Sequence, residues 1–253
     1  ILEVYTQPAK KSGRGQKFNH SDIFHCAKQL KLSVRAPSEI DTIEEINHFK
    51  KLKPDLVVVV AFGKILPTQL LNIDKMLFIN IHASLLPKWR GAAPIQRAIM
   101  NMDYETGVSI MKIVPRLDAG PVMLQEKIKI SEETSYENLS KKMSGIGAKL
   151  ILESIKLIEN NKANFIEQKE SEATYAKKIQ KNESKINWNE SAKKIIAKIN
   201  AFYPNPGCWF KLSGVRIKII KAIEIEKSGN TGTILDNKMT IACSKNAVRI
   251  LEL

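Results

Sequence analysis

Apolar residues follow two different rhythms along the first 160 residues of the chain. Compact apolar runs, typical of strands, lie at residues 1–6, 55–61, 77–81, 108–113 and 122–130. Segments with apolar residues every three or four positions, which predict helices, lie at 21–32, 40–52, 66–73, 95–100 and 135–158. This alternation predicts an α/β fold with a Rossmann-like, doubly wound and mostly parallel sheet.

Local signals refine several of these elements. Ser21 precedes a helical segment and is suited to cap it. The run at 55–61 is almost entirely Val and Leu, which is typical of a central parallel strand buried on both faces. Residues 7–19 combine proline, glycine and serine without apolar periodicity, which predicts a loop.

The pattern changes after residue 158. Residues 159–176 are polar and predict a linker, and a last helix is expected at 190–202. Short strands separated by turns are then expected at 208–212, 215–222, 232–235, 239–243 and 248–251. This rhythm is typical of a small β-barrel. We therefore predict a domain at 1–158, a linker at 159–176 and a second domain at 177–253.

Polar residues interrupt the apolar pattern most informatively between residues 78 and 97. Asn80 and His82 alternate in a predicted strand and therefore share a face. The strand ends in a turn at Ser84–Pro87, and Pro94 suits the first turn of the next helix. Open α/β sheets bind ligands at such strand ends. A histidine there can equally be hydrogen-bonded without any catalytic role, and Asp118, in the turn at 114–121, can simply cap its own backbone.

The net charge of +14 suggests a polyanionic partner, although 33 lysines against seven arginines also fit a compositional bias. The distribution is more informative than the total. Residues 160–253 hold 17 Lys and Arg against nine Asp and Glu. The loop at 7–19 contains four basic residues and no acidic one, which fits a polyanion-binding arm or a solvated loop: Lys10, Lys11, Arg14 and Lys17.

Cysteine and histidine usage indicates no metal centre. Cys26, Cys208 and Cys243 are scattered, as in a reducing compartment, and lack ligand spacing. The other histidines, at positions 20, 25 and 48, have no partners at ligand spacing. No apolar run is long enough to span a bilayer, so we expect no membrane association.

Two motifs carry a family resemblance that extends over nearly the whole chain. N-I-H-A-S-L-L-P-K-W-R-G-A-A-P-I-Q at 80–96 and R-L-D-A-G-P at 116–121 resemble the folate-dependent formyltransferases. The similarity is greatest to the branch that acts on aminoacyl-tRNA. It implies transfer of a formyl group from 10-formyltetrahydrofolate to the amino group of methionyl-initiator tRNA, without a metal.

The resemblance also implies residue roles. The matching catalytic residues are Asn80, His82 and Asp118. The segment that contacts the folate is Ser84, Leu85, Leu86 and Pro87. The basic loop, with its S-G-R-G-Q-K core, would bind tRNA through Lys10, Lys11, Arg14 and Lys17. The second domain would be an OB-like, tRNA-binding barrel. We expect a monomer in the bacterial cytoplasm or an organellar matrix.

The resemblance further suggests that the chain begins after the family's first βα unit and stops before its usual C-terminus. Related formyltransferases remain as alternatives. A glycinamide ribonucleotide enzyme usually lacks the barrel, whereas sugar-nucleotide formyltransferases and formyltetrahydrofolate hydrolases have one. A non-catalytic RNA-binding protein is a different class. The intact Asn80, His82 and Asp118 set argues against it, and the missing first unit argues for it.

Overall fold

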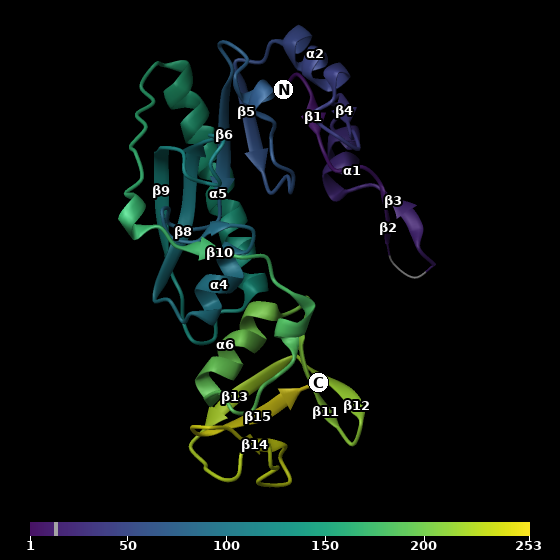
Figure 1. The fold of residues 1–253 in the computed structure, drawn as a ribbon, viewed down its shortest axis with the longest axis vertical. Coiled ribbons are helices and arrows are strands. Elements are labelled where there is room, and N and C mark those ends of the chain that lie inside the picture. The colour runs from purple at the N-terminus through teal and green to yellow at the C-terminus, as the bar shows by residue number, and fades with distance from the viewer. Residues whose placement is uncertain (13–14) are drawn as a thin grey trace. The chain divides into compact units, whose positions relative to one another are not determined.

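A computed structural model describes residues 1–12 and 15–253 (Figure 1). The chain divides into two compact units. Unit 1 comprises Ile1–Ile81 and Met111–Gly120, and unit 2 comprises His82–Ile110 and Pro121–Leu253. Two strands, β6 (Leu77–His82) and β8 (Glu105–Lys112), contribute residues to both units.

The described residues of unit 1 form short strands and three helices. In chain order its elements are β1 (Val4–Tyr5), β2 (Lys10–Ser12), β3 (Lys17–Asn19), α1 (Asp22–Gln29), β4 (Val34–Arg35), α2 (Ile43–Leu52), β5 (Leu56–Val60), α3 (Thr68–Leu71) and most of β6. β1 pairs with β4, and β5 pairs with β6, both in parallel. The predicted cap is confirmed, because the Ser21 hydroxyl accepts a hydrogen bond from Phe24 N.

The core of unit 1 is built from Ile40, Phe49, Leu70 and Phe78. Beside this core lies a buried carboxylate, Glu45, which accepts hydrogen bonds from Arg35 at 2.5 and 3.2 Å and from the Tyr5 hydroxyl at 2.9 Å. Burial raises the pKa of Glu45, but the bonds from Arg35 and Tyr5 outweigh it, so its pKa lies below the usual value.

Two expectations for unit 1 are wrong. Residues 7–19 are not wholly a loop, because β2 and β3 form an antiparallel hairpin with Lys11 opposite Phe18. The strand at 55–61 is not buried on both faces, since Val58 and Val60 are 39% and 56% exposed. Successive side chains point to opposite faces, and only the face with Val57 packs against the core. β-branched residues favour any strand, so composition alone did not identify the open face.

Unit 2 contains the rest of the chain. Its elements are β7 (Arg90–Gly91), α4 (Pro94–Met100), most of β8, β9 (Val122–Lys129), α5 (Tyr136–Glu159), η1 (Glu170–Glu172), β10 (Tyr175–Ala176), η2 (Lys181–Ser184), α6 (Ala192–Phe202), β11 (Cys208–Leu212), β12 (Val215–Ile219), β13 (Lys221–Ile225), β14 (Thr240–Ala242) and β15 (Ala247–Glu252). Pro94 occupies the first turn of α4, as predicted.

A four-stranded sheet has the order β5-β6-β8-β9, and its β5–β6 pair is parallel. The chain is therefore a mixed α/β protein with a central sheet that contains parallel strands. Its last part has two antiparallel sheets, β11-β12 and β13-β15-β14. The strand expected at 232–235 is reduced to a bridge between Ile234 and Ile241. No closed barrel is present among the described residues.

The polar segment predicted as a linker lies against the middle of the chain. β10 pairs in parallel with β7, which lies within the motif at 80–96. Farther along, α6 packs against α4 on one side and against β13 and β15 on another. Among the residues that the structure describes, no helix has the length and apolar character needed to cross a membrane.

Candidate active site

β6 presents the two polar residues of the first motif. Asn80 lies opposite Val59 in the parallel ladder and is partly exposed. His82, two residues on, is only 5% exposed. The alternation along the strand places both side chains on one face, as the sequence predicted. Asn80 belongs to unit 1 and His82 to unit 2.

The imidazole of His82 is held by the main chain seven residues ahead. Its Nε2 lies 2.9 Å from the carbonyl oxygen of Trp89. A carbonyl oxygen can only accept, so Nε2 carries a proton in this bond. In the neutral ring the lone pair is then on Nδ1, which is the nitrogen that takes up a proton when the ring becomes charged.

Trp89 is itself tied to two other segments. Its backbone lies in the left-handed region, with φ of 59°, which is unusual for a bulky residue. Its N–H donates to the Thr174 hydroxyl at 2.9 Å, and its indole Nε1–H donates to Asp103 at 2.6 Å. The motif at 80–96 contains Trp89, but sequence analysis assigned no role to this residue.

The turn at Ser84–Pro87 is shaped by internal hydrogen bonds. The Ser84 hydroxyl donates to Lys88 O and the Ser109 hydroxyl to Ser84 O, both at 2.5 Å. Leu86 N donates to Ser109 at 3.2 Å, and Leu86 O accepts from Gln125 at 3.0 Å. These bonds occupy backbone groups of the segment that the family resemblance assigns to folate contact. Each carbonyl has two lone pairs, so Leu86 O retains one acceptor position.

The second motif, R-L-D-A-G-P, places Asp118 in a constrained turn of unit 1. Asp118 has a left-handed backbone, with φ of 46°, which Asp tolerates better than most residues. Gly120 lies two residues further on. A Cβ at this position would lie 1.9 Å from Lys112 O, so only glycine fits there. These local requirements explain why Asp and Gly occupy positions 118 and 120 of the motif.

Arg90 is a buried residue that sequence reasoning missed. Its side chain is 1% exposed, and its Nε donates to Gln168 at 3.0 Å while Nη1 contacts Glu170 at 3.0 Å. The neighbouring Gly91 has φ of 115°, and a Cβ there would lie 2.9 Å from Ala176 O. The W-R-G sequence therefore fixes residues 89–91 to the segment at 168–176. The sequence signal that could have identified Arg90 is a charged residue among the apolar and small residues at 89–94.

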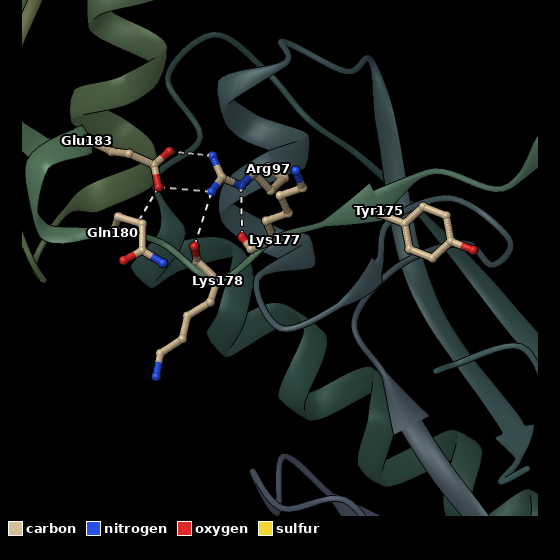
Figure 2. Close-up of a pocket in the computed structure, with 6 residues that line it drawn as sticks. All are labelled: Arg97, Tyr175, Lys177, Lys178, Gln180 and Glu183. Atoms are coloured by element: carbon tan, nitrogen blue, oxygen red, sulfur yellow. Dashed lines mark hydrogen bonds and ion pairs between the residues drawn. The ribbon is translucent and has the colours of Figure 1, made fainter. Parts of the chain in front are cut away.

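A shallow hollow of about 450 Å³ lies beside α4 (Figure 2). Arg97 donates to both carboxylate oxygens of Glu183, at 2.6 and 3.0 Å, and to the carbonyl of Lys177 at 3.1 Å. The Arg97 bonds lower the pKa of Glu183 against the opposing effect of burial. The ion pair therefore fixes residues 177–183 to α4, with exposed Lys177 and Lys178 side chains at the rim.

The basic residues predicted to bind tRNA lie on the β2–β3 hairpin, with one exception. Lys10, Lys11 and Lys17 are exposed, and Lys11 Nζ lies 5.7 Å from the ring centre of Phe18. Phe18 itself is 69% exposed, and sequence analysis did not single it out. Arg14 lies outside the described residues.

Two of the three cysteines, Cys208 and Cys243, are buried, whereas Cys26 is exposed. Burial raises the pKa of the Cys208 thiol to about 12 and that of Cys243 to about 11, so both stay protonated at neutral pH. Within residues 1–12 and 15–253 there is no cluster of three or more His, Cys, Asp or Glu side chains able to hold a metal ion.

Comparison with known families explains the two motifs. Residues 1–155 match the formyl transferase family model, and residues 178–253 match the model of the formyl transferase C-terminal domain. The chain therefore belongs to the formyl transferase family. Among its curated relatives is the methionyl-tRNA formyltransferase of Pelagibacter ubique, 48% identical over 255 residues, covering all of this chain and 82% of that protein. The methionyl-tRNA formyltransferase of Afipia carboxidovorans is 40% identical, covering all of this chain and 83% of its own length.

The fold has solved counterparts. A crystal structure of the N-formyltransferase from Helicobacter canadensis, in complex with folinic acid and dTDP-3-aminofucose, matches with a TM-score of 0.73. The match covers 98% of this chain and 87% of that one, at 20% sequence identity. At this identity the likeness concerns the fold alone.

Proposed function

We propose that this chain transfers a formyl group from 10-formyltetrahydrofolate to the free amino group of methionyl-initiator tRNA. The observation that carries the proposal is the pair Asn80 and His82 on one face of β6, with the lone pair of the neutral His82 ring assigned to Nδ1. Relatives named methionyl-tRNA formyltransferase, at up to 48% identity over the whole chain, support the choice of acceptor.

The reaction needs a neutral amine, a donor for the oxyanion and an acceptor for a proton. The amine nitrogen forms a bond to the formyl carbon, and the bond from that carbon to the folate nitrogen then breaks. Asn80 is an uncharged donor suited to stabilise the oxyanion that develops on the formyl oxygen. His82 takes the proton shed by the amine and returns it to the leaving nitrogen, so charge and protons balance.

Asp118 is the third member of the proposed catalytic set. A carboxylate can only accept hydrogen bonds, so it favours the protonated form of an imidazole over the neutral one. We therefore assign to Asp118 the stabilisation of the His82 imidazolium that forms during transfer.

The folate would be held by Ser84, Leu85, Leu86 and Pro87. When bound, it supplies the formyl group. The residues fit such a ligand, because Leu85 offers apolar cover and Leu86 O keeps an acceptor position for a polar ring edge. The bonds from Ser109 and Gln125 keep this turn in one shape before any ligand arrives.

For the tRNA we propose two basic surfaces. One is the β2–β3 hairpin, with Lys10, Lys11 and Lys17, where the exposed Phe18 ring adds a stacking surface for a base. Arg14, which lies outside the described residues, is proposed to bind tRNA with them. The other lies in residues 177–253, which we propose to be an OB-like, tRNA-binding domain.

The remaining expectations are part of the same proposal. We propose a doubly wound, Rossmann-like core in residues 1–158, a connecting segment at 159–176 and a monomeric protein. We propose that the protein is located in the bacterial cytoplasm or in an organellar matrix, where initiator tRNA is formylated.

One assay tests the function. Formylation is measured with 10-formyltetrahydrofolate and methionyl-initiator tRNA, and separately with an amino-sugar nucleotide or with water as acceptor. We expect transfer to tRNA, and a loss of about 10²–10³ in kcat for Asn80→Ala. His82→Ala should lose at least as much, because it removes the proton acceptor. Transfer only to the sugar, or only to water, would contradict the proposal.

A further inference from the structure

We infer that Trp89 is a positioning residue for His82, and that Asp103 and Thr174 hold Trp89 in place. The inference rests on the catalytic role proposed above for His82. It concerns residues of unit 2 alone, which are joined by a continuous set of hydrogen bonds.

The first contact is the one that fixes the ring. The Trp89 carbonyl accepts the Nε2 proton of His82 at 2.9 Å. This bond is possible in both the neutral and the protonated ring, because Nε2 bears a proton in each. His82 can therefore gain and lose a proton at Nδ1 without leaving its anchor. An anchor of this kind keeps the ring still during proton transfer, which is where positioning matters most.

The direction of that carbonyl depends on an uncommon backbone conformation. Trp89 has φ of 59°, a region that bulky side chains rarely adopt unless surrounding contacts impose it. Those contacts come from Thr174. Its hydroxyl accepts from Trp89 N at 2.9 Å, its carbonyl accepts from Arg90 N at 2.9 Å, and its N–H donates to Pro87 O at 3.3 Å.

The side chain of Trp89 is held as well. Its indole N–H donates to Asp103 Oδ2 at 2.6 Å, a short bond of the charge-assisted kind. Asp103 is fixed in turn, because its N–H donates to Ala98 O at 3.0 Å and its Oδ1 accepts from Asn101 at 2.6 Å. Neither Trp89 nor Asp103 is fully buried, so this bond orients the turn and is not required for a closed core.

The test separates orientation from folding by matched variants. Asp103→Leu removes the acceptor, whereas Asp103→Asn keeps an amide oxygen for the indole if Asn101 turns its own amide to suit. Trp89→Phe removes the donor and keeps an aromatic ring, so it remains informative should Asp103→Leu fold poorly. We expect kcat to fall about 10-fold in Asp103→Leu and Trp89→Phe, with KM for tRNA unchanged. Asp103→Asn should restore kcat.

A second readout is independent of activity. The ¹⁵N shifts of His82 distinguish a nitrogen that bears a proton from one with a lone pair. In the neutral ring we expect the proton on Nε2 in the wild type, and a mixture of tautomers in Asp103→Leu and Trp89→Phe. The inference would be overturned if the neutral His82 ring of the wild type carried its proton on Nδ1. It would also be overturned if the His82 ¹⁵N shifts were the same in the wild type and in all variants.

The two hypotheses fail in different ways. Wild-type turnover in His82→Ala would overturn the catalytic role proposed for that residue. Loss of turnover in His82→Ala, together with wild-type kcat in both Asp103→Leu and Trp89→Phe, would overturn only the positioning role of Trp89.

Discussion

At the scale of residues, the chemistry of this protein depends on which hydrogen bonds each polar group has already made. Among the four histidines, His82 lies beside a main-chain acceptor that fixes which ring nitrogen holds the proton. His48, by contrast, pairs with Glu3 at 2.6 Å, and His20 stacks on Phe24. The same type of side chain thus forms an ion pair or stacks on a ring in one place, and in another it is held by the main chain.

Asp118 gives the first prediction at this scale. Asp118→Asn removes the charge but keeps a residue that tolerates the left-handed backbone, so folding should be unchanged and kcat should fall. We expect a loss of about 10-fold or more and an altered pH–rate profile, measured with saturating substrates. If the Asp118→Asn variant turned over like the wild type with the same profile, Asp118 would be a turn residue only. Asp118→Ala adds backbone strain and serves as the comparison for stability.

Glu45 gives the second prediction at the scale of residues. Its pKa is lowered, so the stability that its bonds contribute is present above the usual carboxyl pKa and is lost as pH falls through the lower, folded value. Glu45→Gln should cost about 1.5–3 kcal/mol near neutral pH, because it weakens bonds to a charged partner. Urea unfolding from pH 7 down to pH 3 would measure this, and the variant should lose less stability on acidification than the wild type.

Glu44 provides the matched control for that experiment. It lies 3.6 Å from the same Arg35, but its side chain is 84% exposed. Solvent screens such a pair, so Glu44→Gln should change the free energy of unfolding by about 0.5 kcal/mol or less. Equal effects of the two substitutions would show that burial of Glu45 does not decide its contribution.

At the scale of elements, the β2–β3 hairpin turns a basic stretch into a defined arm. Pairing of Lys11 with Phe18 and of Ser12 with Lys17 sets the order of residues along both strands. An antiparallel pair presents charge and an aromatic ring together more reproducibly than a loop does. This geometry is the reason that the proposed tRNA contact rests on the hairpin and not on composition alone.

The corresponding prediction concerns three lysines. The combined change Lys10→Gln, Lys11→Gln and Lys17→Gln should weaken tRNA binding and reduce the magnitude of the slope of log K against log salt by about 2–3. Turnover at saturating tRNA should remain measurable. The matched control neutralises three exposed lysines of α5, at positions 141, 142 and 149, and should leave the slope unchanged. Equal slopes for the hairpin variant and the wild type would exclude the arm as a phosphate-binding element.

At the scale of the whole molecule, charge is distributed over both units. Residues 160–253, all in unit 2, account for +8 of the formal +14, and the hairpin of unit 1 adds a separate cluster. Such a distribution suits a long polyanion better than a small anionic substrate, because only a long ligand can meet several clusters at once.

We therefore expect a strong salt dependence for the wild-type protein. With six or more phosphate contacts, affinity for methionyl-initiator tRNA should fall by about 10³-fold between about 50 and 200 mM salt. Affinity for an amino-sugar nucleotide, which has two phosphates, should change far less over that range. Fluorescence anisotropy across a salt series would measure both ligands, and similar slopes would contradict recognition of an extended tRNA surface.

Much of this molecule was determined locally and could be predicted from the sequence. Ser21 and Pro94 mark helix starts because capping and a fixed φ act within a few residues. Asn80 and His82 share a face because a strand alternates its side chains. The α/β alternation and the long helix at 136–159 follow from contacts between near neighbours in the chain. The two family motifs could be recognised in the sequence because each is a continuous run of residues.

Tertiary structure decided what depends on residues far apart. The open face of β5, with Val58 and Val60, could not be predicted because β-branched residues suit exposed and buried strands alike. Within the polar segment at 159–176, Thr174 holds Trp89 and Glu170 holds Arg90 across about 80 residues of sequence. These contacts could not be predicted from the sequence. Hydrogen bonds at that separation leave no periodic trace in the chain. The proton of His82 could be assigned to Nε2 only from the folded structure, because the assignment depends on the direction of the Trp89 carbonyl.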